Sequence, residues 1–444
     1  MQAAREMGLG KSSVRRCNGG TRLAAELAGD ANTQAPAIEQ ADIIMNAQLN
    51  TTSSEPTTST LDILKTLIGF NTISRESNLG LIEWVRDYLE RHGATTRLTY
   101  DAERRKANLF ATISGAARTP FGTVFSGHTD VVPVKGQNWD SDPFVARVAD
   151  GKLFGRGACD MKGFIAVCLA RLPSIDQDRL HTPLHFSFSY DEEVGCLGVR
   201  ELLADLAQHQ IKPTGVIIGE PTSMQAVIAH KGKRSYRCSV HGHAAHSSCP
   251  HLGINSIDYA AMMQLKIREI AHRVRQSEAQ DYDFDVPYSS ICTTLSNGGN
   301  APNIIPDKAE FVFEHRFLPG VDPQQVFNEV KSYAQTEIEP QMSIDGARGR
   351  IEFETLTAYP GMSTPANDPL VASALRILGS ERAKKVGFGT EGGLFGEAGM
   401  PAVICGPGDI AHAHKPNEFV TLEQLARCES FFDNFVAQSN LQPA

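Results

Sequence analysis

Residues 122–133 read Gly-Thr-Val-Phe-Ser-Gly-His-Thr-Asp-Val-Val-Pro, a short apolar run that leads into a histidine and an aspartate. A run of this length between turn residues indicates a buried β-strand over Gly122–Ser126. His128 and Asp130 then follow the carboxyl end of that strand. In open α/β sheets this edge is where ligands bind. We therefore predict that the stretch supplies one strand of a sheet and part of a functional site.

Three further apolar runs are followed by polar groups in the same way. These runs cover residues 184–190, 215–218 and 402–405. Helical patterns separate the runs, which favours the α/β class with a mostly parallel central sheet. All four groups of polar residues are then expected at the ligand-binding edge of that sheet. The residues that follow the three further runs are Asp191, Glu192, Glu193, Glu220, His412 and His414.

Another segment, residues 155–163, places Asp160 just before an apolar helical pattern. Imidazole and carboxylate together are good ligands for Zn²⁺ and similar divalent ions. Two histidines and three carboxylates suffice for two neighbouring ions if one carboxylate bridges them. One such residue alone is more often an ordinary polar loop residue. Four strand ends that all carry such groups favour a metal site.

The spacing of these residues suggests different roles for neighbours. Side chains of adjacent residues in an extended chain point in opposite directions. One of Glu192 and Glu193 can therefore bind metal while the other handles protons. His128 and Asp130 are two residues apart and point the same way, so Asp130 can accept the second ring N–H of a ligating His128.

The middle of the chain has a different pattern. Strand patterns at 235–240, 290–295 and 308–317 are combined with helical patterns at 255–275 and 321–337. That β-α-β-β-α order is typical of a small α+β domain inserted into a larger one. We divide the chain into an extension (residues 1–55), a catalytic domain in two parts (56–232 and 346–444) and an inserted domain (233–345).

Composition excludes several classes of protein. The 444 residues carry a formal net charge of −9 with no long basic run, so nucleic acid is not an expected partner. No stretch has the roughly 18 apolar residues of a membrane helix. The nine cysteines form no Cys-x-x-Cys pair, which favours reduced thiols in a cytoplasmic protein. Residues 1–55 have no apolar signal-peptide core, and we interpret them as a disordered extension or an overlong start before Met45.

The motifs SGHTDVVP, GRGACDMKGF, DEEVGCLG, GEPT and AHKPNE resemble those of a two-metal family of metallopeptidases and deacylases. That family contains acetylornithine deacetylases, succinyl-diaminopimelate desuccinylases, aminoacylases and glutamate carboxypeptidases. The resemblance runs from about residue 58 to 440, and residues 219–248 are most similar to the acetylornithine deacetylase branch. It implies an exopeptidase-like catalytic domain, and an inserted ferredoxin-like domain that serves as a lid and joins two subunits in a homodimer.

The resemblance also implies roles for individual residues. The implied metal is Zn²⁺, with Co²⁺ as an alternative, and the peptide bond after the bridging aspartate is expected to be cis. Glu192 would be the general base, Asp130 would orient a ligand, and His246 would reach a neighbouring active site in a dimer. Asn303 and Arg316 would bind substrate. The metal ligands would be His128, Asp160, Glu193, Glu220 and His414. Each histidine would bind one ion together with one of the two glutamates, and Asp160 would bridge both ions.

The expected reaction is hydrolysis of an N-acyl amino acid. The first candidate is N2-acetyl-L-ornithine, cleaved to L-ornithine and acetate in arginine biosynthesis. The glycine-rich run 387–393 indicates a close approach of the backbone to a ligand near Thr390 and Glu391. Glu391 is the residue that would meet a cationic, ornithine-like side chain.

Other functions stay open at this point. A broader aminoacylase or a glutamate-type carboxypeptidase would use the same metals on another substrate. A metal-binding protein without catalysis would not need Glu192 beside Glu193. A two-metal phosphoesterase would need basic residues to hold phosphate, and only Arg156 and Lys162 are near the predicted metals in the sequence.

Overall fold

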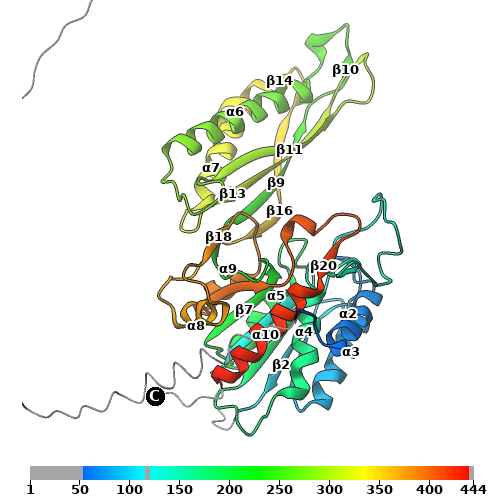
Figure 1. Ribbon diagram of the computed structural model, residues 1–444. Helices are drawn as coiled ribbons and strands as arrows, with labels where there is room; N and C mark the ends of the chain where they lie inside the picture. Colours follow the sequence, from blue (N-terminus) through cyan, green and yellow to red (C-terminus); the bar gives the residue numbers. More distant parts are fainter. Residues whose placement is uncertain (1–53, 116–120, 440–444) are drawn as a thin grey trace, which may run out of the picture. The chain divides into compact units, whose positions relative to one another are not determined.

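The computed structural model describes residues 54–115 and 121–439. Nearly all of the predicted extension, together with Cys17 and Met45, lies outside the described residues. The described residues all belong to one compact unit. Within it the chain builds a large sheet domain and a smaller inserted domain (Figure 1).

The large domain is built on a nine-stranded sheet with the order β1-β2-β6-β3-β7-β19-β8-β17, and β18 pairs with β8. Neighbours in the central group β6, β3, β7 and β19 run parallel, whereas β1 and β2 add antiparallel strands at one edge. The predicted α/β class with a mostly parallel centre is therefore confirmed. The strands are β1 (Thr95–Tyr100), β2 (Ala107–Ile113), β3 (Thr123–His128), β6 (Leu184–Ser189), β7 (Gly215–Pro221), β8 (Val227–His230), β17 (Met362–Ser363), β18 (Lys384–Val386) and β19 (Ala402–Gly406).

Helices cover both faces of this sheet, as expected for strands that are apolar on both sides. Helices α2, α3, α4, α8 and α10 contribute to the apolar core on one face, and α5 and α9 to the core on the other. Helix α4 lies at the centre, and nine of its ten residues are buried. The helices are α2 (Thr58–Gly69), α3 (Leu79–Arg91), α4 (Lys162–Arg171), α5 (Gly198–Gln208), α8 (Pro369–Leu378), α9 (Gly392–Glu397) and α10 (Leu422–Ser439).

A small three-stranded sheet of β4, β5 and β20 lies beside the site described below. Its order is β20-β5-β4, so residues near 150 pair with residues near 420. This pairing brings the segment before α4 close to the segment that follows His414. The strands are β4 (Arg147–Ala149), β5 (Lys152–Phe154) and β20 (Phe419–Thr421).

The inserted domain is a four-stranded antiparallel sheet of order β11-β13-β9-β16, with α6 and α7 on one face (Figure 1). Its element order β9-α6-β11-β13-α7-β16 and its strand order are those of a ferredoxin-like fold. Strand β13 alternates buried and partly exposed residues, as its sequence pattern predicts. The elements are β9 (Gly232–His241), α6 (Ser256–Ser277), β11 (Ser290–Gly298), β13 (Lys308–Phe317), α7 (Pro323–Tyr333) and β16 (Arg350–Tyr359); two short pairs are β10 (Ala245–His246) with β12 (Ile304–Ile305), and β14 (Ser343–Ile344) with β15 (Ala347–Arg348).

The boundary predicted at residue 345 is wrong in one respect. Strand β16 pairs with β9 along its length, from Arg350 opposite His241 to Tyr359 opposite Lys233. Residues 350–359 therefore complete the sheet of the inserted domain, although the sequence interpretation gave them to the second part of the catalytic domain. When two paired strands are more than 100 residues apart in the sequence, neither strand carries a local sequence pattern that identifies its partner.

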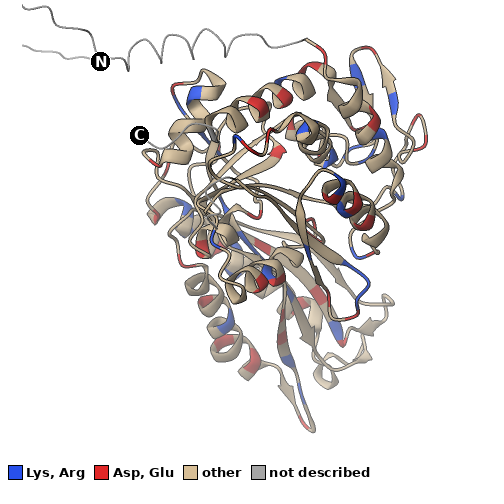
Figure 2. Cartoon of the chain, turned by 90° about the horizontal axis from the view of Figure 1, so that it is seen from below, with Lys and Arg blue, Asp and Glu red and all other residues tan. Residues whose placement is uncertain are grey.

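Charged residues of both signs are mixed over the surface of the described chain. Figure 2 shows Lys and Arg interspersed with Asp and Glu on the helices of both domains. Among the described residues, no helix has the length and apolar character to cross a bilayer.

Candidate metal centre

Asp160 lies between two histidines that come from distant parts of the chain. Its Oδ1 atom is 2.9 Å from Nε2 of His128, and its Oδ2 atom is 3.1 Å from Nε2 of His414. His128 ends strand β3, Asp160 precedes α4, and His414 follows β19. The peptide bond between Asp160 and Met161 is cis, as the family resemblance implies. The parallel sheet thus brings three of the predicted ligands to one edge.

Two glutamates extend this group on opposite sides. Glu193, which follows β6, has its carboxylate oxygens 3.0 Å from Nε2 of His414. Glu220, near the end of β7, has Oε1 3.7 Å from Nε2 of His128. All five predicted ligands therefore meet in one place, each histidine beside one glutamate and both beside Asp160.

The spacing of these atoms fits divalent metal ions. Two ligands bound about 2.0–2.1 Å from one tetrahedral Zn²⁺ are roughly 3.3 Å apart. The separations of 2.9–3.7 Å between donor atoms lie around that value. Two sets of residues have donor atoms that all lie within 4.8 Å of one another within the set. One set is His128, Asp160 and Glu193, and the other is His128, Glu192 and Glu220.

The charges also fit cations. Glu193 and Glu220 are largely buried beside Asp160. Burial and the neighbouring negative charge raise the pKa of both carboxyl groups, for Glu193 to about 7. Burial alone would raise the pKa of Asp160 as well, but the hydrogen bonds with the two histidines hold it well below its usual range. Several buried carboxylates without enough positive charge are costly, and two divalent cations would remove that cost.

Four of the five predicted ligands, all except His128, line a cavity of about 160 Å³ between the two domains. Lys233 and Arg316 reach it from β9 and β13 of the inserted domain, opposite the acidic residues of the catalytic domain. The cavity is lined further by Thr357, Tyr359, Phe388, Gly389 and Ile410. A substrate in this cavity would contact both domains.

Asp130 holds the neighbouring loop with its carboxylate. Its Oδ1 atom accepts the backbone N–H of Glu192 at 3.0 Å, and Oδ2 accepts the Ser74 hydroxyl at 2.7 Å. Nδ1 of His128 lies 2.9 Å from the backbone carbonyl oxygen of Asp130 and 3.5 Å from its Oδ1. In this structure the carbonyl is thus the nearer partner of the ring N–H, whereas the sequence predicted the carboxylate.

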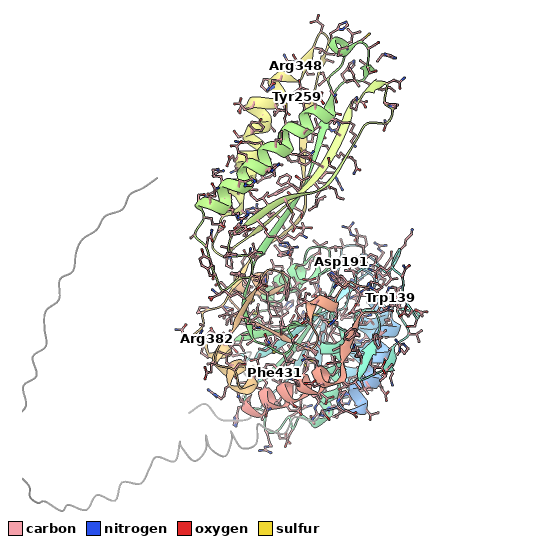
Figure 3. The ribbon with its side chains drawn as sticks, turned by 45° about the horizontal axis from the view of Figure 1, so that its top comes forward. Trp139, Asp191, Tyr259, Arg348, Arg382 and Phe431 are labelled. Atoms are coloured by element: carbon pink, nitrogen blue, oxygen red, sulfur yellow. The ribbon has the colours of Figure 1, made fainter. Side chains whose placement is uncertain are left out.

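Glu192 has the surroundings of a proton carrier. It lines the cavity, and its Oε1 atom accepts a hydrogen bond from the thiol of Cys196 at 3.4 Å. Burial raises its pKa well above the ordinary value. Its predecessor Asp191, labelled on the catalytic domain in Figure 3, instead pairs with buried Lys106 and accepts the backbone N–H of Arg75 at 2.7 Å. The three acids of this loop therefore have separate environments.

Glu418 is a residue beside the site that the sequence interpretation missed. Its Oε1 atom accepts the backbone N–H groups of Cys159 at 2.9 Å and Asp160 at 3.0 Å. Its Oε2 atom accepts from Arg156 at 2.6 Å, and both side chains are 1% exposed. Glu418 thereby joins the Asp160 segment to the segment that carries His414. Its place in the AHKPNE motif is the only signal of this role in the sequence.

Arg316 lines the cavity and forms a charged group with two neighbours. Its Nε atom donates to Oε1 of Glu314 at 2.5 Å, and Lys233 contacts Oε2 of the same residue at 2.9 Å. Glu314 offsets one of the two positive charges, so the group presents a net charge of about +1 to the cavity. That suits a single carboxylate, which the guanidinium can bind through two hydrogen bonds.

Thr390 and Glu391 are close to the centre but do not line the cavity. Both are nearly fully buried, and the Glu391 carboxylate accepts the Ser189 hydroxyl at 2.6 Å. Burial raises its pKa to about 7. The residues of this run that line the cavity are Phe388 and Gly389. Substrate binding by Thr390 and Glu391 stays a prediction.

His246 and Asn303 lie together on the inserted domain. His246 pairs with Ile304 in the β10–β12 ladder, and the backbone N–H of Ser247 donates to the Asn303 carbonyl at 3.0 Å. Both side chains are exposed, and neither lines the cavity of this chain. A role in the active site of a neighbouring subunit stays a prediction.

Comparison with known proteins identifies the family. The model of "Peptidase family M20/M25/M40" matches residues 124–438. The chain is 33% identical over 349 residues to an acetylornithine deacetylase of Proteus mirabilis (strain HI4320). The aligned stretch covers 78% of this chain and 86% of the relative. The fold is similar to an M20 family metallo-carboxypeptidase of Sulfolobus solfataricus (TM-score 0.68, 19% identity, 86% and 100% covered). It is also similar to a dinuclear metal-binding M20 peptidase of Bacillus subtilis (TM-score 0.58, 16% identity, 89% and 99% covered). The chain therefore belongs to peptidase family M20/M25/M40, a family of metal-dependent hydrolases.

Proposed function

We propose that this chain hydrolyses the amide bond of N-acyl amino acids with the help of two divalent cations. The observation that carries the proposal is the position of Asp160, whose two carboxylate oxygens each face a different histidine at 2.9 and 3.1 Å. A carboxylate in that position suits a bridge between two ions. His128 and Glu220 would hold one ion, and His414 and Glu193 the other.

Zn²⁺ suits the imidazole and carboxylate ligands, and Co²⁺ is the alternative. When bound, the two ions would polarise the acyl carbonyl and lower the pKa of a water molecule to about 7. The three carboxylates of Asp160, Glu193 and Glu220 offset three of the four positive charges of two such ions. The remaining charge favours an anion at the reacting centre.

The side chains of the cavity would divide the remaining work. Glu192 takes a proton from the attacking water and returns it to the leaving amine, a role for which burial and a raised pKa suit it. Arg316 binds the α-carboxylate of the amino acid. Tyr359 and Phe388 form walls that limit the access of bulk water to the bound substrate.

The first substrate we propose is N2-acetyl-L-ornithine, cleaved to L-ornithine and acetate as a step of arginine biosynthesis. The similarity to a protein named acetylornithine deacetylase supports it. One observation favours the second candidate, a broader aminoacylase. Among the described lining residues, the only carboxylates are the predicted metal ligands and Glu192, so none is left to meet the ornithine ammonium group.

We further propose a homodimer formed through the inserted domain. Strand β11 is an edge strand of its sheet, and edge strands with exposed apolar side chains are prone to pair. Leu295 on β11 is 61% exposed and Leu265 on α6 is 64% exposed. These two elements also line a hollow of about 700 Å³. A partner on this face would cover apolar surface that is open to water in one chain.

The deciding experiment compares substrates. Hydrolysis of N2-acetyl-L-ornithine, N-acetyl-L-methionine and N-succinyl-diaminopimelate is measured with protein stripped of metal and after addition of Zn²⁺ or Co²⁺. Metal-dependent hydrolysis that is fastest for N2-acetyl-L-ornithine supports the first substrate, and similar rates with N-acetyl-L-methionine support the aminoacylase. No metal-dependent hydrolysis of any N-acyl amino acid would refute the proposed function.

A further inference from the structure

A second and larger cavity lies at the junction of the two domains. Its volume is about 750 Å³, within the usual range for sites that bind small molecules. The chain crosses between the domains twice, near Gly232 and near Gly361, and these two crossings touch. A Cβ atom on Gly232 would lie 2.6 Å from the backbone nitrogen of Gly361. We call this space the hinge cavity, because residues 317–323 of the inserted domain, the crossing 358–365 and residues around α9 all line it.

Two arginines of the hinge cavity have no acidic partner. Arg234 donates to the side-chain oxygen of Gln324 at 2.7 Å, and Arg200 donates to the backbone carbonyl of Cys196 at 3.2 Å and to that of Ala358. Within residues 54–115 and 121–439, neither guanidinium has a carboxylate within 4.0 Å. A guanidinium has five N–H donors, so both keep donors for a ligand.

The remaining walls define what kind of ligand fits. Glu397 is the one carboxylate among the described lining residues, so the two arginines leave a net charge of about +1. Phe317, Tyr359 and Met362 supply apolar surface. Arginine binds planar carboxylates through paired hydrogen bonds, and apolar walls take up a hydrocarbon or aromatic body. A small organic carboxylate with an apolar body satisfies both parts.

The hinge cavity is connected to the metal centre by direct contacts. Tyr359 lines both the hinge cavity and the cavity that holds the predicted metal ligands. Arg200 bonds the carbonyl of Cys196, and the thiol of Cys196 donates to Glu192 at 3.4 Å. An occupant that draws the Arg200 guanidinium towards itself would therefore act on the loop that carries Glu192. It would also contact both domains, which together line the cavity at the metals.

The geometry points to the hinge cavity as a second ligand site, which takes a small organic carboxylate with an apolar body and changes turnover at the metal centre. Binding there requires no metal ion. The effect on turnover rests on the proposed hydrolase function, whereas the binding itself does not. All the residues that define the site here belong to this chain.

A crystal soak tests the location directly, with 4-bromobenzoate as the probe. The zinc-loaded protein is soaked with the probe, and anomalous scattering locates the bromine. We expect bromine density in the hinge cavity, with the carboxylate at Arg200 or Arg234. Bromine only at the metal centre, or no bound bromine at concentrations of several millimolar, overturns the proposal.

Titration of the zinc-loaded protein in solution tests the residues. The double substitution Arg200→Gln, Arg234→Gln should weaken binding of 4-bromobenzoate at least tenfold. Arg237→Gln is the matched control, because Arg237 is on the same strand as Arg234 but pairs with exposed Glu354. Unchanged affinity in the double variant overturns the proposal. If the double variant does not fold, the two single variants are titrated instead, and each should lose affinity.

Kinetics separate the hinge cavity from the metal centre. At saturating substrate the probe should change kcat at least twofold, and the change should disappear in the double variant. Purely competitive inhibition that persists in the double variant places the probe at the metal centre and overturns the proposed effect on turnover. If no substrate of the chain is found, the proposed function fails, but the soak and the titration still decide whether the ligand site exists.

Discussion

Glu418 accepts the backbone N–H of Asp160 at 3.0 Å, so a residue four positions after His414 fixes the residue that faces both histidines. The same carboxylate binds buried Arg156. Two segments some 250 residues apart in the chain are thus joined beneath the predicted metal site. Partners of this kind orient ligands and tune the affinity for metal.

Loss of the Glu418 carboxylate should weaken metal binding. In Glu418→Gln the acceptor for Cys159 and Asp160 is uncharged, and we expect a metal affinity lower by about 10- to 100-fold, as for other such partners. Titration with Zn²⁺ measures this, and kcat should recover when metal is in excess. Exposed Glu423→Gln is the control. Since the substitution leaves the buried Arg156 without its charged partner, the double variant Arg156→Met, Glu418→Gln serves if the single variant is unstable. Wild-type affinity in a folded variant contradicts the assigned role.

Substitution of Glu192 should affect turnover but not metal binding. Glu192→Gln keeps the size of the side chain and removes its ability to accept a proton, so we expect kcat to fall by about 10²- to 10⁴-fold. Measurement of bound metal should still find two ions per chain. Glu193→Gln is the matched control, and it should lose bound metal because it removes a ligand. If Glu192→Gln loses its metals instead, the roles of the two glutamates are exchanged.

Arg316→Lys should mainly affect substrate binding. Lysine keeps the positive charge beside Glu314 but cannot form the paired hydrogen bonds of a guanidinium. We expect KM for an N-acyl amino acid to rise about tenfold or more, with a smaller change in kcat. Arg350→Lys, at an exposed position of β16, is the control. A KM equal to that of the wild type would exclude Arg316 from carboxylate binding.

The stability of the fold should depend on pH through His230. Its Nδ1 atom lies 2.9 Å from the Lys231 carbonyl, its Nε2 accepts the N–H of Thr390 at 3.4 Å, and burial lowers its pKa to about 4. Since the unfolded chain takes up this proton near pH 6.5, the folded state loses stability as the pH falls from about 6.5 to about 4, by on the order of 3 kcal/mol.

Thermal unfolding of His230→Gln against the wild type tests this dependence. The difference in Tm between the two proteins should change between pH 4.5 and pH 7, because the variant lacks the titrating ring. Exposed His272→Gln should follow the wild type at every pH. A His230→Gln variant whose Tm runs parallel to that of the wild type over this range would show that the ring has the same pKa in the folded and unfolded states, which contradicts the assigned shift.

The four parallel strands β3, β6, β7 and β19 could be predicted because each is buried on both faces. Residues 216–218 and 402–405 are continuously apolar, and that pattern can be recognised without knowing the partner strands. The same property located the ligands, since His128, Glu193, Glu220 and His414 all follow such runs. The convergence of these side chains is a consequence of parallel pairing, which the runs themselves indicate.

Other features depend on contacts that leave no local pattern. Strand β16 is exposed or half-exposed along its length, and only its pairing with β9 makes it a strand of the inserted domain. In the sequence Glu418 looks like many other acidic residues. It is the pairing of β20 with β5 that brings Glu418 next to Asp160. The glycine-rich run around Gly389 is expected to approach a ligand near Thr390 and Glu391. In the structure Phe388 and Gly389 line the cavity, whereas Glu391 does not.

The central claim is that five side chains converge on two cations, and anomalous diffraction from crystals of the zinc-loaded protein tests it most directly. Data on both sides of the zinc absorption edge should show two peaks within bonding distance of Asp160. One peak should lie beside His128 and Glu220, and the other beside His414 and Glu193. Zinc peaks elsewhere in the chain with none at Asp160, or a single ion that contacts only one of the histidines, would contradict the claim.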